Sequence, residues 1–108
     1  MGKYHAKKTV VDGITFMSRK ESERYIVLRD MVGTGEISGL KLQPKFLLLP
    51  TTRYNGETLR QKSYIADFSY WQDGKEIVED VKGFKTPIYS LKKHMLICKY
   101  PDINFIET

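Results

Sequence analysis

Asp67 and Asp80 lie on two strand-like segments joined by a tight turn, a spacing that could bring two carboxylates together. The turn is Asp73-Gly74, and Asp-Gly between segments rich in β-branched and aromatic residues is a strong signal for a β-hairpin. With these two residues at the centre of the turn, the register places Asp67 directly opposite Asp80 on one face. Their Cβ atoms would then be about 5 Å apart.

Two opposed carboxylates destabilise a sheet when nothing is bound, because the like charges repel and each raises the pKa of the other. A divalent cation such as Mg²⁺ removes that cost, since hard cations bind carboxylate oxygens. Lys82 follows Asp80 by two residues and therefore faces the same side, where it could contact a phosphate or an attacking water. The alternative interpretation is an ordinary polar hairpin, or one whose register is broken by a bulge.

A helix that begins near Ser18 supplies a third carboxylate, Glu21. Ser18-Arg-Lys-Glu21 has the form of a capping box, and the helix is expected to run to about Val32. At about 100° per residue, Glu21 lies on the same core-facing stripe as Tyr25, Leu28 and Val32. Two roles therefore stay open for Glu21, the helix cap and the metal site.

The remaining elements follow from turn residues and periodicity. Asp12-Gly13 predicts a hairpin over residues 9–16, and Thr86-Pro87 opens a second helix. The apolar stripe of that helix is expected at Ile88, Leu91, Met95 and Cys98. The other expected elements are a strand over 41–49, a polar loop over 51–60, the acidic hairpin over 62–82 and a last strand over 103–106.

Composition indicates one globular domain over residues 1–108 with a net charge of +5. Such a mildly basic chain favours a polyanionic partner. The single Cys98 excludes an internal disulfide and a cysteine-based zinc site, and it fits a reducing cytoplasm. No membrane segment is visible. Lys85, Lys92 and Lys93 follow the acidic hairpin, where they could be simply solvated or could contact DNA phosphates.

The order of these features resembles the PD-(D/E)XK nuclease superfamily, with Glu21, Asp67 and Asp80-Val81-Lys82 at its motif positions. Ala66 stands where the superfamily's name has proline. Short segments are also similar to a phage and prophage family of small nuclease-like proteins, in which Met17 would be a departure. These segments are residues 3–8, 12–21, 43–46, 64–68 and 81–86.

The resemblance implies an α/β (α+β) fold with an αβββαβ restriction-endonuclease-like core, a mixed sheet flanked by two helices and preceded by the 9–16 hairpin. It implies an endonuclease that hydrolyses DNA phosphodiesters in the cytoplasm of a bacterial host. Asp67, Asp80 and Glu21 would ligate Mg²⁺, for which Mn²⁺ could substitute, and Lys82 would orient the attacking water.

Nothing in the chain looks like a separate sequence-reading module, so we expect structure-selective or weakly specific cutting of duplex or branched DNA, such as Holliday junctions. Symmetric cutting of two strands would require a homodimer, which the sequence permits. The rival hypotheses are a non-catalytic nucleic-acid-binding protein and a structural protein of the phage particle, each on a nuclease-like scaffold.

Overall fold

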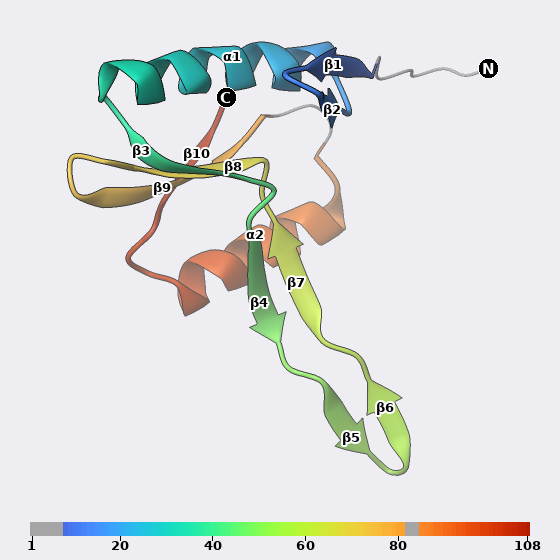
Figure 1. The fold of residues 1–108 in the computed structure, drawn as a ribbon. Coiled ribbons are helices and arrows are strands. Elements are labelled where there is room, and N and C mark those ends of the chain that lie inside the picture. The colour runs from blue at the N-terminus through green and yellow to red at the C-terminus, as the bar shows by residue number, and fades with distance from the viewer. Residues whose placement is uncertain (1–7, 82–84) are drawn as a thin grey trace.

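The computed structural model describes residues 8–81 and 85–108, and this part of the chain is a mixed α+β structure (Figure 1). Its helices are α1 (Arg19–Thr34) and α2 (Pro87–Lys99). Its strands are β1 (Thr9–Val11), β2 (Ile14–Phe16), β3 (Ser38–Leu42), β4 (Lys45–Leu49), β5 (Thr52–Tyr54), β6 (Glu57–Leu59), β7 (Lys62–Ile65), β8 (Phe68–Gln72), β9 (Lys75–Asp80) and β10 (Asn104–Glu107). Across these residues neither helix is long and apolar enough to cross a membrane.

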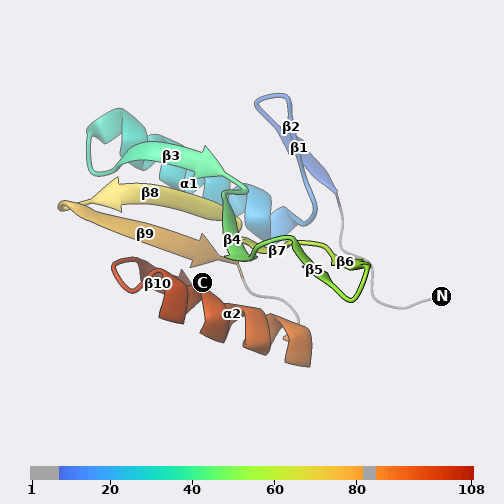
Figure 2. The same cartoon turned by 90° about the horizontal axis from the view of Figure 1, so that it is seen from below.

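The main sheet has the strand order β10-β9-β8-β3, with β10 parallel to β9 and the other pairs antiparallel. Figures 1 and 2 show the sheet lying between α1 on one face and α2 on the other. The expected mixed sheet with a helix on each face is therefore confirmed at this coarse level. Smaller two-stranded sheets pair β1 with β2, β4 with β7, and β5 with β6.

Each face of the sheet has its own apolar core, because successive side chains of a strand point to opposite faces. On the α1 side, Leu28 is fully buried in a cluster with Phe68 and Tyr70. On the α2 side, Leu96 is fully buried in a cluster with Val78. Burying a side chain of this size contributes about 1.5–3 kcal/mol, so these two layers hold the helices on the sheet.

The central hairpin has the register that its turn predicts. The pairs run from Gln72 opposite Lys75 to Phe68 opposite Glu79. The turn residue Asp73 has a φ of 52°, as a type I′ turn requires, and Asp12 in the β1–β2 hairpin has a φ of 53°. Both Asp-Gly turns are therefore confirmed, but the acidic hairpin is shorter than the expected 62–82 because β7 (Lys62–Ile65) pairs with β4 instead of β9.

Helix α1 begins where the capping box predicts, because the Glu21 N–H donates to the Ser18 hydroxyl at 3.2 Å. It continues two residues past the expected end, to Thr34, before Gly35 adopts a left-handed conformation with a φ of 83°. Val32 was expected to be buried and is 40% exposed, because Met31 packs against the core in this last turn.

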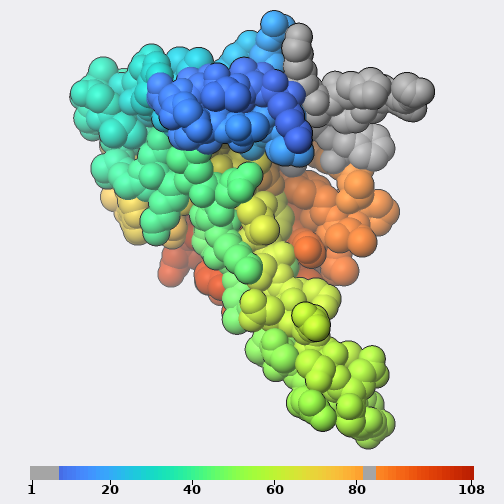
Figure 3. All heavy atoms as spheres, turned by 45° about the vertical axis from the view of Figure 1, so that its right-hand side comes forward, coloured from blue at the N-terminus to red at the C-terminus, as the bar shows by residue number. Residues whose placement is uncertain are grey.

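The segment over 51–60 is a β-hairpin, and the expectation of a polar loop was wrong. β5 and β6 are joined by Asn55-Gly56, in which Asn55 has a φ of 51° and Gly56 a φ of 77°. Asn-Gly suits a type I′ hairpin turn, and the chain uses it although the flanking residues are polar. Together with β4 and β7 this hairpin forms a projection, residues 45–65, that we call the arm (Figures 1 and 3).

The apolar stripe predicted for α2 was wrong except at Met95, which packs against the core. Ile88 is 67% exposed, Leu91 is 60% exposed and Cys98 is exposed, whereas Leu96 is fully buried. The helix is turned so that Tyr89 and Leu96 face the sheet. A half-buried tyrosine supplies a large packing area and can also hydrogen-bond, as Tyr89 does to Glu107.

Candidate functional site

Glu21 and Asp67 line the same pocket, which has a volume of about 130 Å³. Glu21 is in the first turn of α1 and is 8% exposed, and Asp67 lies between β7 and β8 and is half-buried. The other lining residues are Gln43, Ile14, Thr15, Phe16 and Leu42. The fold therefore brings together two of the three predicted carboxylates.

Backbone hydrogen bonds fix the place of Asp67. The Gln43 N–H donates to the Asp67 carbonyl at 2.9 Å, and the Ala66 N–H donates to the Pro44 carbonyl at 3.1 Å. Gln43 has a φ of 50°, a left-handed conformation in which the chain leaves β3 for β4. The pocket thus lies at the junction of the sheet and the arm.

Asp80 is adjacent to Asp67, one residue beyond the last regular pair of the β8–β9 ladder. The Asp67 N–H donates to Asp80 Oδ1 at 3.0 Å, and the Val81 N–H donates to Asp67 Oδ2 at 2.7 Å. The Tyr64 hydroxyl donates to Asp80 Oδ2. These donors offset the charge repulsion that the predicted pairing implies, because hydrogen bonds to a carboxylate favour its charged form.

Tyr64 is a partner of the acids that sequence patterns did not identify. It is 3% exposed, and burial, followed by its hydrogen bond to Asp80, raises the pKa of its hydroxyl far above the ordinary value. The hydroxyl therefore stays protonated and remains a donor to Asp80 across the physiological range of pH. This contact holds the Asp80 carboxylate in one orientation.

The pocket offers a partial set of metal ligands. In the described ranges, 8–81 and 85–108, no group of three or more His, Cys, Asp or Glu side chains is arranged to hold a metal ion. Mg²⁺, however, is commonly held by one or two carboxylates, with water and substrate phosphate in its other positions. Glu21 and Asp67 fit that pattern. Asp80 is not among the residues that line this pocket, but it accepts the Asp67 N–H and so holds the Asp67 backbone beside it.

The predicted cationic residues lie in three different settings. Lys82 falls outside the described residues. Lys92 lines a separate pocket of about 240 Å³ together with Tyr64 and Tyr89. Lys85 and Lys93 each form an ion pair with Glu107 at 3.3 Å. Of these three described lysines, Lys92 is the one that lines a pocket with Tyr64, the donor to Asp80.

Glu107 gives the fold a pH-dependent contribution. The hydrogen bond from Tyr89, followed by those from Lys85 and Lys93, lowers the pKa of Glu107 from 4.5 to about 2. Because the folded pKa is depressed, this stabilisation is fully present above pH 4.5 and is lost as the pH falls toward 2. We expect Glu107→Gln to lower the free energy of unfolding at pH 6 and to flatten its dependence on pH between 4.5 and 2.

Urea unfolding at a series of pH values measures this effect, with the exposed Glu57→Gln in the arm as the matched control. A Glu107→Gln curve parallel to that of the wild type over the same range would contradict the assignment.

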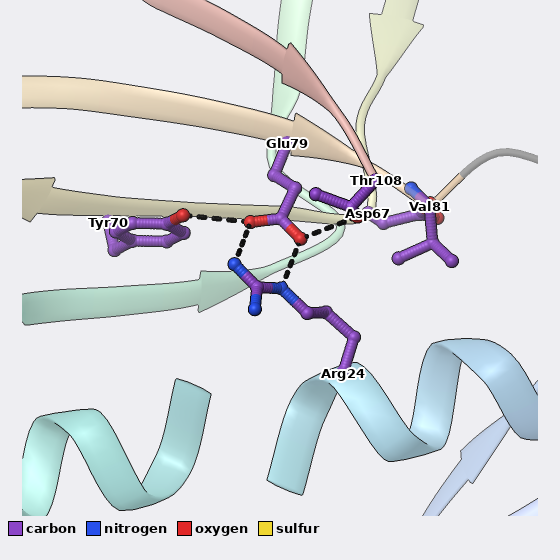
Figure 4. Close-up of polar contacts among 6 residues, drawn as sticks. All are labelled: Arg24, Asp67, Tyr70, Glu79, Val81 and Thr108. Atoms are coloured by element: carbon purple, nitrogen blue, oxygen red, sulfur yellow. Dashed lines mark hydrogen bonds and ion pairs between the residues drawn. The ribbon is translucent and has the colours of Figure 1, made fainter. Parts of the chain in front are cut away.

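Glu79 is the largest feature of the sheet that the sequence patterns missed. It is fully buried on the α1 face, where Arg24 donates from Nη2 to Oε1 at 3.0 Å and from Nε to Oε2 at 2.5 Å. The Tyr70 hydroxyl donates at 2.8 Å and the Thr108 hydroxyl at 2.8 Å (Figure 4). Because successive side chains of a strand point to opposite faces, Glu79 must lie on the face of the sheet opposite to Asp80. A helix covers each face, so this position could have indicated a buried carboxylate that needs a cationic partner.

All but the last residue of the sequence match a protein family. Residues 1–107 correspond to the family described as "Protein of unknown function (DUF1064)". A comparison with curated proteins gave no match.

Proposed function

We propose a function from the site itself, because the chain belongs to the DUF1064 family, whose function is not known. The proposal is that this protein is a divalent-metal-dependent endonuclease that hydrolyses phosphodiester bonds of DNA. The observation that carries it is the convergence of Glu21 and Asp67 on one pocket, with the Asp80 carboxylate bonded to the Asp67 backbone. Carboxylates placed in this way suit a hard cation.

Each residue has a proposed role. Glu21 and Asp67 would hold Mg²⁺ or Mn²⁺, and Asp80, which accepts the Asp67 N–H, would keep Asp67 in position. A bound Mg²⁺ supplies a water of lowered pKa and neutralises charge on the phosphate. Lys82, two residues beyond Asp80, would position that water. Lys92 would contact a neighbouring phosphate, because it lines a pocket next to Tyr64.

The arrangement of elements supports the same proposal. A helix that carries Glu21 is followed by the antiparallel strands β3, β8 and β9, then by α2 and the parallel strand β10. This order resembles the αβββαβ core of the PD-(D/E)XK superfamily, and we propose that the fold is of that kind. The arm, residues 45–65, would then be an insertion between the first two strands of the core.

One observation favours a second candidate, a nucleic-acid-binding protein without catalysis. The carboxylates of Asp67 and Asp80 already accept hydrogen bonds from Val81, Asp67 and Tyr64, so protein donors satisfy part of their charge. In a protein that binds no metal, the two carboxylates would serve to hold β7, β8 and β9 together through these hydrogen bonds. Salt-sensitive DNA binding without cleavage is what this candidate predicts.

The deciding experiment incubates supercoiled, linear and four-way-junction DNA with the full chain in Mg²⁺, Mn²⁺ or EDTA. We expect nicking or cutting of at least one substrate in either metal and none in EDTA. A matching RNA duplex measures selectivity for DNA. DNA binding with no cleavage of any substrate in either metal would overturn the nuclease proposal and support the second candidate.

A further inference from the structure

The arm projects from the molecule, and its outer half packs on neither core. Its proximal strands, β4 and β7, pack on α2 through Phe46, Leu48 and Tyr64. Its distal hairpin, β5 and β6, projects away from the body (Figures 1 and 3). None of residues 52–59, all of them described, belongs to either core cluster. An isolated two-stranded ribbon is only marginally stable in water, so a projecting one is best explained by a partner.

The charge of the arm indicates a polyanionic partner. It carries four basic side chains and one acidic side chain, Glu57. All four basic side chains are exposed, and they are Lys45, Arg53, Arg60 and Lys62. Over the full chain there are 18 basic and 13 acidic side chains, so the ratio of basic to acidic residues is much higher in the arm than in the whole protein.

The two faces of the distal hairpin differ in character. Arg53 pairs with Thr58 on one face, whereas Tyr54, its partner Glu57 and Leu59 lie on the other because side chains alternate along a strand. Tyr54 is 66% exposed and Leu59 is 46% exposed. Both faces suit nucleic acid, since arginine contacts phosphates or base edges and apolar side chains contact sugars and thymine methyl groups.

The size of the arm matches a DNA duplex. From Lys45 to Tyr54 an extended chain at about 3.3 Å per residue spans about 30 Å. One turn of B-DNA is about 34 Å, and its major groove, about 12 Å wide, admits a two-stranded β-ribbon. The distal hairpin, which packs on neither core, can therefore enter the groove, while the proximal strands stay packed on α2.

The base of the arm is part of the candidate site. Gln43 and Asp67, which line the pocket with Glu21, lie just before β4 and just after β7, and they are hydrogen-bonded to each other. A duplex held along the arm would consequently pass the pocket at the point where β4 and β7 join the body. The arm and the acids are then parts of one DNA-binding surface.

We propose that the arm is a DNA-binding element that lies in the major groove of duplex DNA and sets the position of the duplex at the Glu21–Asp67 pocket. The placement at the pocket rests on the nuclease function proposed above. The binding of duplex DNA by the arm does not, because it requires neither metal nor cleavage.

The test uses a variant in which Asn-Gly replaces residues 52–59, giving a short type I′ hairpin. This truncation removes Arg53 and Glu57 together, so the net charge of the protein is unchanged. It removes no core residue, and circular dichroism and thermal unfolding check that the body stays folded. Arg53→Ala and the double variant Arg53→Ala, Arg60→Ala complete the series. Lys75→Ala, exposed beside the turn between β8 and β9, is the matched single-charge control.

The measurement is fluorescence anisotropy of a labelled 30-bp duplex in EDTA over a series of KCl concentrations. We expect the truncation to weaken binding at least tenfold at 100 mM KCl. The double variant should reduce the slope of log affinity against log salt by about 0.9 for each phosphate that the protein no longer neutralises. Lys75→Ala should bind as the wild type does.

Wild-type affinity in the truncation would overturn the proposal. A truncation that sediments as a monomer where the wild type sediments as a dimer, with DNA affinity unchanged, would also overturn it. That result would identify a second copy of the chain as the partner of the arm. A wild-type protein that binds DNA through the arm but never cleaves it would refute only the nuclease function, so the two proposals fail in different ways.

Discussion

Asp67→Asn is expected to lower metal-dependent DNA cleavage by about 10³-fold. Ligation of Mg²⁺ supplies several kcal/mol of charge stabilisation to the transition state, and each 1.36 kcal/mol corresponds to a factor of ten in rate. Asparagine has nearly the same shape as aspartate and can still accept the hydrogen bond from the Val81 N–H, so the fold should survive. Single-turnover cleavage of supercoiled DNA measures the loss.

The control for this variant is Asp73→Asn, in the turn of the same hairpin. Asparagine suits the positive φ of 52° at that position, so folding and cleavage should both remain close to wild type. DNA binding in EDTA should be retained by Asp67→Asn as well. Cleavage by Asp67→Asn within a few-fold of the wild-type rate would show that Asp67 has no catalytic role.

Arg24→Met is expected to destabilise the fold by about 3–5 kcal/mol, because it leaves the fully buried carboxylate of Glu79 without its cation. The matched control is Arg29→Met in the same helix. Arg29 pairs with Asp12 at the surface, where both side chains are more than 40% exposed, and an exposed pair contributes about 0–1 kcal/mol.

Urea unfolding of the two variants at pH 7 gives the comparison directly. The double variant Arg24→Met, Glu79→Gln should recover part of the loss, since it removes the uncompensated charge together with its partner. If Arg24→Met destabilised no more than Arg29→Met, the buried pair would not be a major support of the sheet.

The parts of the fold that were predicted correctly depend on local chemistry. Asp12-Gly13 and Asp73-Gly74 fix their hairpins because a type I′ turn determines the register of the strands beside it. Ser18 and Thr86 fix the starts of the helices because their side chains accept bonds from the first free N–H groups. These signals act over a few residues and can be seen in the sequence.

The parts that were predicted wrongly depend on packing between distant elements. Which face of α2 is buried is decided by where Tyr89 and Leu96 meet the sheet, and apolar spacing along the helix does not contain that information. The arm was missed because its distal strands are exposed and polar, so they lack the alternation of a half-buried strand.

The candidate site was predictable in part. The shared pocket of Glu21 and Asp67 follows from a helix stripe that faces a sheet, and the neighbourhood of Asp80 follows from the register of the hairpin. The donors around the acids could not be inferred. Tyr64 precedes Asp67 by only three residues, but a change of strand between β7 and β8 brings its hydroxyl to Asp80.

The most direct test of the proposed metal site is a titration of the full chain with Mn²⁺. Binding is measured as the loss of the electron paramagnetic resonance signal of the free ion. We expect the wild type and Asp73→Asn to bind Mn²⁺ alike, and Asp67→Asn and Glu21→Gln each to bind at least about tenfold more weakly. Equal binding by all four proteins, or no binding by the wild type, would contradict the claim that Glu21 and Asp67 form a metal site.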